Sequence, residues 1–72
     1  MSKEISQMGK NIKKLREQKG LSQDWLSKIA DNSYNTVIKL ESGDITNPSI
    51  DTLQKLAKTL NVSVDDLLKV PK

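Results

Sequence analysis

Hydrophobic residues recur at helical spacing from the start of the chain. Four of them follow one another at steps of three and four positions: Ile5, Met8, Ile12 and Leu15. This spacing puts their side chains on one stripe of a helix and leaves polar residues on the remaining surface. Gly20 is expected to end this helix, because glycine readily adopts the left-handed conformation that follows a last helical turn.

A second short helix is predicted from the residues that come next. Ser22 can accept a hydrogen bond from a backbone amide of the first turn, and Asp24 places a favourable negative charge in that turn. Leu26 and Ile29 are expected on the inner face of this helix. It is predicted to run to about Ala30.

A turn and a third helix follow. Residues 31–33 read Asp-Asn-Ser, which predicts a turn, since Asp and Asn tolerate left-handed backbone and the serine can cap the next helix. Val37 and Leu40 are expected to point inward, and Gly43 is expected to end this helix. The polar segment 44–48 ends in proline and cannot continue it.

The C-terminal part of the chain predicts two more helices. Ser49 can begin a fourth helix that ends at Asn61, and Ser63 with Asp66 can begin a fifth. The apolar residues of these two helices are Ile50, Leu53, Leu56, Ala57, Leu60, Leu67 and Leu68.

The composition agrees with a small helical domain. The chain has 72 residues, of which 35% are hydrophobic, and it shows no alternating strand pattern, internal repeat or interdomain linker. We therefore predict one all-α domain over residues 1–72, with its core at about residues 8–69 and frayed ends.

The charge is distributed unevenly. Residues 1–39 hold 8 Lys/Arg against 4 Asp/Glu, a net +4, whereas residues 40–72 hold 4 against 5, a net −1. A basic half suits a polyanionic partner such as nucleic acid, although a solvated helix face explains a weak excess equally well.

Several classes of chemistry are not expected. Without Cys or His the chain offers no thiol nucleophile, no histidine base and no Cys/His zinc site. We therefore expect neither an enzyme nor a metal or cofactor site. Residues 1–10 are mostly polar and lack the apolar stretch of a signal peptide, and no apolar run approaches the roughly 18 residues of a membrane span, so a cytoplasmic protein without a membrane partner is expected.

The second and third helices, joined by a short turn, fit the helix-turn-helix arrangement that places one helix in the DNA major groove. Specific residues add to this pattern: LSQDWL at 21–26, IA at 29–30, Val37, LESG at 40–43, PSIDTL at 48–53 and LNVSVDDLL at 60–68. In these residues the chain resembles the Cro/CI (XRE-type) helix-turn-helix family. The resemblance implies a compact five-helix, lambda-repressor-like domain that binds double-stranded operator DNA, usually as a symmetric dimer.

The resemblance places base readout on the third helix, at Tyr34, Asn35, Thr36 and Lys39. Asn can pair with adenine, Lys can donate to guanine, and the Thr methyl can touch a thymine methyl. Tyr34 either donates its hydroxyl to a phosphate or packs against the second helix, and both interpretations stay open.

Phosphate contacts are implied for a second group of residues, namely Gln23, Ser33, Ser42, Thr46 and Asn47. The Gln23 amide both donates and accepts, so it can bind a phosphate and orient a neighbouring group. The acidic Asp44 stands in a stretch where the family often has Lys or Arg, and it is expected to weaken the loop contacts. Lysines can add non-specific attraction: Lys10, Lys13, Lys14, Lys28 and Lys39. Only one or two are expected to touch DNA, since residues 10, 13 and 14 can share a face that looks away from the groove.

Some residues are expected to have structural roles. Arg16 and Glu41 match a family ion pair that joins the first helix to the end of the third. Asp31 and Asn32 replace the usual Gly and apolar residue of the turn and are expected to weaken the packing of the helix pair. Ile38 is expected to cover the edge of the core rather than to touch a thymine methyl group.

Contacts with a second chain are implied near the C-terminus. Leu67, Leu68 and Val70 are candidates for a homodimer interface, with core packing expected to explain at least one of them. Trp25, the largest apolar surface of the chain, is expected to seal the core or, alternatively, to belong to a partner surface.

These residues predict a bacterial or phage transcriptional regulator. We expect a repressor that binds a palindromic operator as a dimer, although activation fits the same residues. The alternative is an antitoxin or anti-regulator that uses the same fold to cover a protein partner.

Overall fold

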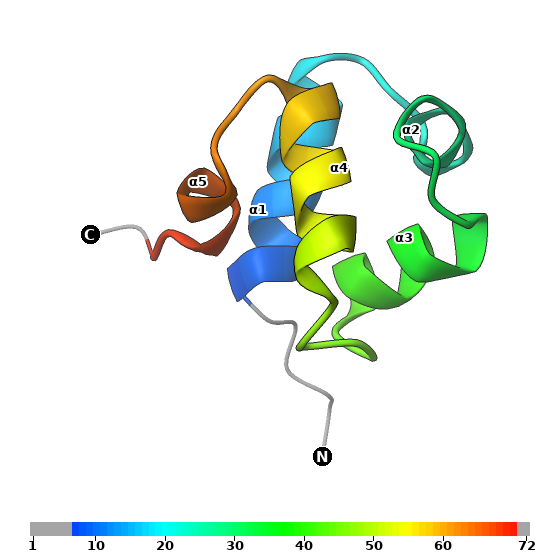
Figure 1. The fold of residues 1–72 in the computed structure, drawn as a ribbon. Helices are drawn as coiled ribbons and strands as arrows, with labels where there is room; N and C mark the ends of the chain where they lie inside the picture. The colour runs from blue at the N-terminus through cyan, green and yellow to red at the C-terminus, as the bar shows by residue number, and fades with distance from the viewer. Residues whose placement is uncertain (1–6, 71–72) are drawn as a thin grey trace.

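Five α-helices joined by short connections make up the computed structural model, which describes residues 7–70 (Figure 1). They are α1 (Gln7–Gln18), α2 (Gln23–Ile29), α3 (Tyr34–Ser42), α4 (Ile50–Leu60) and α5 (Val64–Leu68). The predicted all-α, five-helix fold is confirmed. Ile5 of the first predicted stripe lies outside the described residues.

A serine begins each helix from α2 to α5. The side chains of Ser22, Ser33, Ser49 and Ser63 each accept a hydrogen bond from the backbone amide three residues later. Such caps stabilise a helix by about 1 kcal/mol. At α5 the Asp66 carboxylate also accepts from the Ser63 amide at 3.1 Å, and this hydrogen bond lowers the pKa of Asp66. The predicted helix starts are confirmed.

The helix ends also follow the local sequence. Gly43 closes α3 with a φ of 89° and Asn61 closes α4 with a φ of 60°, both left-handed. Asp31, where the family commonly has glycine, takes a φ of 55° in the turn between α2 and α3. The turn therefore forms despite the substitution. The neighbouring Asn32 lowers the stability of the fold, because its side-chain Nδ2 is buried without a hydrogen-bond partner.

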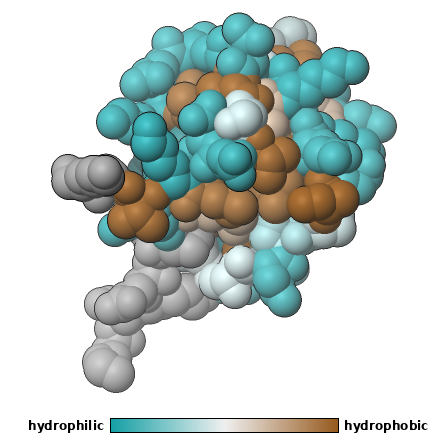
Figure 2. Space-filling model, turned by 60° about the vertical axis from the view of Figure 1, so that its left-hand side comes forward, coloured by the Kyte–Doolittle hydropathy of each residue, from teal (hydrophilic) through white to brown (hydrophobic). Residues whose placement is uncertain are grey.

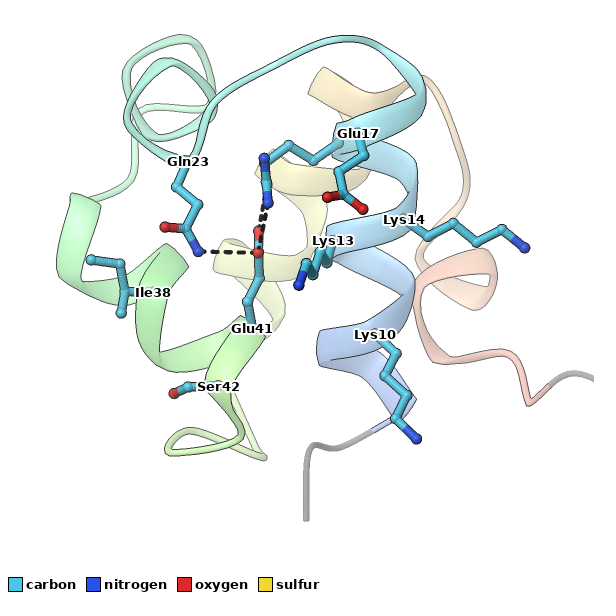
Figure 3. Close-up of a pocket in the computed structure, with 9 residues that line it drawn as sticks. Lys10, Lys13, Lys14, Glu17, Gln23, Ile38, Glu41 and Ser42 are labelled. Atoms are coloured by element: carbon cyan, nitrogen blue, oxygen red, sulfur yellow. Dashed lines mark hydrogen bonds and ion pairs between the residues drawn. The ribbon is translucent and has the colours of Figure 1, made fainter. Parts of the chain in front are cut away.

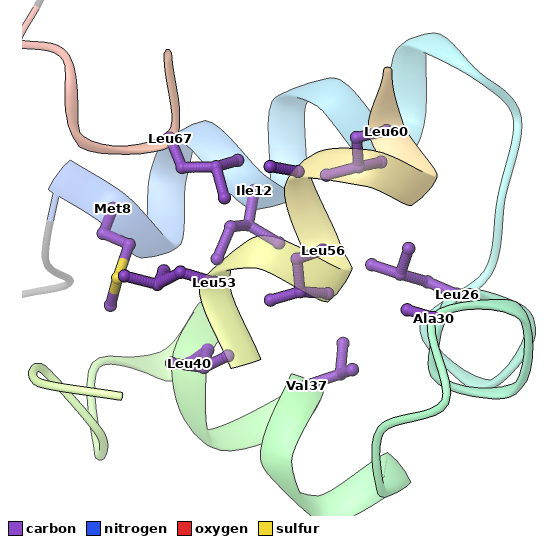
Figure 4. Packing of buried hydrophobic residues seen from close by; sticks show 11 residues of the cluster. Met8, Ile12, Leu26, Ala30, Val37, Leu40, Leu53, Leu56, Leu60 and Leu67 are labelled. Atoms are coloured by element: carbon purple, nitrogen blue, oxygen red, sulfur yellow. The ribbon is translucent and has the colours of Figure 1, made fainter. Parts of the chain in front are cut away.

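Side chains from all five helices meet around Leu56 of α4 (Figure 4). The buried hydrophobic residues are Met8, Ile12, Leu26, Ala30, Val37, Leu40, Leu53, Leu56, Ala57, Leu60 and Leu67. This core is aliphatic apart from the Met8 thioether. In Figure 1, α4 crosses in front of α1, with α5 on one side and α3 on the other.

Three expectations about the core were wrong. Trp25 and Ile29 are 53% and 47% exposed, because each precedes a buried residue of α2 by one position, which turns it by about 100° around the helix. Ile50 is 63% exposed, since it lies in the first turn of α4, beyond the end of the buried stripe. Trp25 therefore does not seal the core.

A glycine allows α1 and α3 to approach closely. Gly9 is buried in α1. A Cβ atom at this position would lie 3.3 Å from the Glu41 Cα and would overlap the carbonyl oxygen of Leu40. Both obstacles are backbone atoms of α3, which cannot move aside as the end of a side chain can. The distance between these two helices therefore depends on the missing side chain.

Gly9→Ala is expected to destabilise the protein. Overpacking costs about 1–3 kcal/mol, which outweighs the gain of about 1 kcal/mol from the better helix propensity of alanine. Thermal unfolding followed by circular dichroism measures the change. Gln18→Ala, at an exposed position of the same helix, is the control, and the explanation is wrong if both variants unfold at the wild-type temperature.

Candidate nucleic-acid interface

The outer face of α3 presents polar side chains to solvent. Asn35 and Lys39 are exposed and lie one helical turn apart, on the side opposite the buried Val37 and Leu40. Tyr34, at the start of the helix, is 47% exposed. These positions are therefore accessible to a ligand that lies along α3.

Thr36 lies at the edge of this face. Its side chain is partly exposed, and its hydroxyl lies 2.7 Å from the Ser33 Oγ at the start of the helix. At 100° per residue it stands about 60° from Lys39 around the helix, so its part in base readout stays a prediction. Ser33 is exposed, but its hydroxyl serves mainly as the cap of α3.

A buried ion pair joins α1 to α3. Arg16 donates from Nε to Glu41 Oε2 at 2.7 Å and from Nη2 to Glu41 Oε1 at 3.0 Å. Its remaining nitrogen, Nη1, donates to the Leu21 carbonyl at 2.7 Å. The residues are only 9% and 6% exposed, and the hydrogen bond to Glu41 raises the pKa of Arg16. The structure thus contains the pair that the family resemblance implied.

Gln23 is attached to the same pair. Its Nε2 donates to Glu41 Oε1 at 3.1 Å, so the first residue of α2 is tied to the end of α3. The sequence predicts a phosphate contact for Gln23 but gives no sign of this bond, because no local pattern links residues that are 18 positions apart. The bond uses one of the two amide hydrogens and leaves the other, together with the carbonyl oxygen, available to a ligand.

A shallow groove runs between α1 and α3 (Figure 3). Its lining includes Lys10, Lys13, Lys14, Gln23, Ile38 and Ser42. The Lys13 side chain points toward α3, whereas the ends of Lys10 and Lys14 extend away from it (Figure 3). The lysine face therefore does not simply look away from the third helix, and Lys13 adds positive charge beside it. Lys28 instead forms an exposed ion pair with Asp24 at 3.3 Å.

Polar groups at the end of α3 and in the following loop form hydrogen bonds with one another. The Ser42 hydroxyl donates to the Asp44 carboxylate at 3.1 Å or to the Lys39 carbonyl at 3.2 Å. A hydroxyl has one hydrogen, so a phosphate bound by Ser42 would have to replace these acceptors. Thr46 and Asn47 are exposed. The acidic residue therefore competes directly with a phosphate for this donor.

The C-terminal hydrophobic residues lie on the other side of α1 from α3 (Figure 1). Leu67 is fully buried and belongs to the core, as expected for at least one of the three candidates, so it cannot be a dimer contact. Leu68 and Val70 are 47% and 68% exposed. The face on which α5 comes forward shows hydrophobic patches among hydrophilic residues (Figure 2). The Asn11 side chain fixes this end by donating to the carbonyls of Leu67 and Lys69.

Other kinds of site are not formed by the part of the chain that the structure describes. Within residues 7–70 no group of three or more His, Cys, Asp or Glu side chains could hold a metal ion. None of the helices in this range has the length and hydrophobicity that crossing a membrane requires.

A family model described as helix-turn-helix matches residues 12–67. The chain belongs to the helix-turn-helix family of the Cro/CI (XRE) type. Among curated relatives, the HTH-type transcriptional regulator PuuR of Escherichia coli K12 is 32% identical over 71 residues. The match covers 99% of this chain and 38% of PuuR, so the chain spans well under half the length of that relative. The curated relatives of this chain are named as transcriptional regulators, not as enzymes, as expected.

The fold of SinR from Bacillus subtilis is also similar. A structure of SinR in complex with DNA has a TM-score of 0.84 and 37% identity, and the match covers 86% of this chain and 98% of that one. A SinR–SinI protein complex gives a TM-score of 0.82 and 38% identity, with coverage of 85% and 59%.

Arg16→Met is expected to destabilise the domain strongly. The substitution leaves the buried Glu41 carboxylate without its cation, which costs about 3–5 kcal/mol. A chain of this length has a total stability of only about 4–11 kcal/mol, so the substitution removes a large part of it. Urea denaturation followed by circular dichroism measures the loss.

Lys28→Met is the matched control, because it breaks the exposed pair with Asp24. Loss of an exposed pair costs at most about 1 kcal/mol. Equal losses in Arg16→Met and Lys28→Met would show that the buried pair does not hold α1 against α3.

Proposed function

We propose that this chain is a sequence-specific DNA-binding transcriptional regulator whose α3 enters the major groove. The observation that carries the proposal is the exposed polar face of α3 beside the lysine-lined groove, with Gln23 held at its edge by Glu41. A helix with polar outer residues next to positive charge fits the shape and the potential of duplex DNA. The resemblance to PuuR and to DNA-bound SinR supports the same function.

Base readout belongs to Asn35 and Lys39 in this proposal. The Asn35 amide can pair with the N6 and N7 atoms of adenine, and Lys39 can donate to guanine. The Tyr34 hydroxyl can donate to a phosphate at the groove edge. The Thr36 hydroxyl already lies beside Ser33, so a contact from Thr36 to a base would come from its methyl group.

Phosphate contacts hold the helix in place. Gln23 can use its second amide hydrogen, Lys13 its ammonium group, and Thr46 and Asn47 their exposed polar groups. Ser42 contributes only when a phosphate replaces the Asp44 carboxylate as its acceptor. The proposed contacts to the DNA backbone therefore come from α1, from α2 and from the loop after α3.

The regulator acts in this proposal as a repressor that covers a promoter in the bacterial cytoplasm. A dimer on a palindromic operator would place its two α3 helices about 34 Å apart, one turn of DNA. Leu68 and Val70 are the proposed dimer contacts, because they are exposed hydrophobic residues on the side of α1 away from α3.

A second function is supported by the outer face of α2. Trp25 and Ile29 lie one turn apart there and are about half exposed, which is unusual for residues of this size. An antitoxin or anti-regulator could use them to contact a protein partner. The SinR–SinI complex shows that a relative of this fold is found with a protein.

Selection of bound sequences from random duplex DNA tests the DNA-binding proposal. The wild type is expected to enrich a palindrome, and Asn35→Ala to lose discrimination at one position of each half-site, by about 1–3 kcal/mol. Ile29→Ala, on the outer face of α2, should leave the palindrome unchanged. If the folded protein enriches no sequence, the proposal fails and a protein partner becomes the better explanation.

Lys13→Ala is expected to make binding to the selected site less sensitive to salt. Each lost phosphate contact should reduce the slope of log K against log salt by about 0.9. Lys58→Ala, an exposed lysine on α4, is the control and should keep the wild-type slope. Titrations at several salt concentrations measure both. An unchanged slope in Lys13→Ala would remove α1 from the interface.

A further inference from the structure

Ile38 is a hydrophobic residue in an unexpected place. It lines the groove between α1 and α3, where the other lining residues are all polar or charged and the basic ones outnumber the acidic ones: Lys10, Lys13, Lys14, Arg16, Glu17, Gln23, Glu41 and Ser42. It is partly exposed, and it is not among the partly buried hydrophobic residues that pack against the core, which are Leu15, Leu21, Ile45, Val62 and Val64. The expectation that Ile38 covers the edge of the core was therefore wrong.

The helix geometry places Ile38 beside the residues that are proposed to contact the bases. It follows Asn35 by three positions and precedes Ser42 by four, so the three side chains lie on adjoining parts of one face of α3. The other aliphatic residues of α3, Val37 and Leu40, are fully buried. Ile38 is thus the aliphatic side chain that α3 leaves open to a ligand.

The surroundings of Ile38 point to DNA rather than to an apolar partner. Lys13 reaches toward α3 from one side, and Lys39 follows Ile38 directly in the chain. A hydrophobic protein surface placed here would have to cover these charges without neutralising them, at a desolvation cost. A duplex supplies phosphates for the lysines and base edges for the residues between them.

The major groove offers one apolar group, the C5-methyl group of thymine. We infer that Ile38 is a specificity-determining residue that contacts this methyl group at one thymine of each half-site, and the inference rests on the proposed function. From the sequence alone, the contact with a thymine methyl group is expected from the Thr36 methyl group. The structure turns Thr36 toward the helix start and leaves the larger aliphatic side chain of Ile38 on the open face.

The test removes the methyl group from the DNA and the side chain from the protein. In the selected site each thymine is replaced in turn by deoxyuridine, which lacks only the methyl group. Wild type and Ile38→Ala are titrated with each duplex. Burying one such group changes an equilibrium by about fourfold, so the wild type should lose about threefold to tenfold in affinity at one thymine. Ile38→Ala should lose almost nothing at that same position.

Ile29→Ala provides the matched control, since it removes the same atoms from an exposed isoleucine on α2 and should keep full sensitivity to deoxyuridine. Circular dichroism establishes that each variant is folded. If the wild type tolerates deoxyuridine at every position, or if Ile38→Ala loses as much as the wild type, the inference is overturned while the proposed function stands. If the wild type selects no sequence at all, the proposed function and the inference fail together.

Discussion

The contact between Arg16 and Glu41 fixes the geometry on which the rest of this fold depends. It brings together four parts of the chain, because Arg16 also donates to the Leu21 carbonyl and Gln23 donates to the same carboxylate. Burying two charges is costly unless their hydrogen bonds are satisfied, and here both oxygens of Glu41 and all three nitrogens of Arg16 have partners. The network therefore holds α1, α2 and α3 in one relative orientation.

A directional network adds a constraint that the core does not supply. The core is aliphatic, so its contacts are not directional, whereas a hydrogen bond needs a defined distance and angle. Gly9 supplies the second constraint, because the absence of its side chain lets α1 lie directly against the backbone of Leu40 and Glu41. Together they set how far α3 stands out from the domain, and a reading helix must enter a groove at a defined depth and angle.

Local signals in the sequence predicted the elements well. Serine caps, Gly43 and Asn61 act on the backbone within a few residues, so their effects can be read without knowledge of the fold. The orientation of a helix is a tertiary property. Trp25, Ile29 and Ile50 are apolar, but the inner face is decided by neighbouring helices, and these three residues fall outside it. Leu67 and Leu68 illustrate the same limit, since adjacent leucines of one helix divide between core and surface.

The candidate site was predictable only where the family resemblance supplied roles. It supplied Arg16 and Glu41, and the exposed face at Asn35 and Lys39, but not the bond from Gln23 or the position of Ile38. These two features change how the surface would work. Gln23 is held in place by the ion pair before any ligand arrives, so less conformational freedom is lost on binding. In the proposed complex with DNA, positive charge from Lys13 supplies attraction that any duplex satisfies, while the apolar Ile38 in the same groove adds a contact that depends on the base. Attraction and discrimination thus come from neighbouring side chains on different helices, both positioned by the same buried pair.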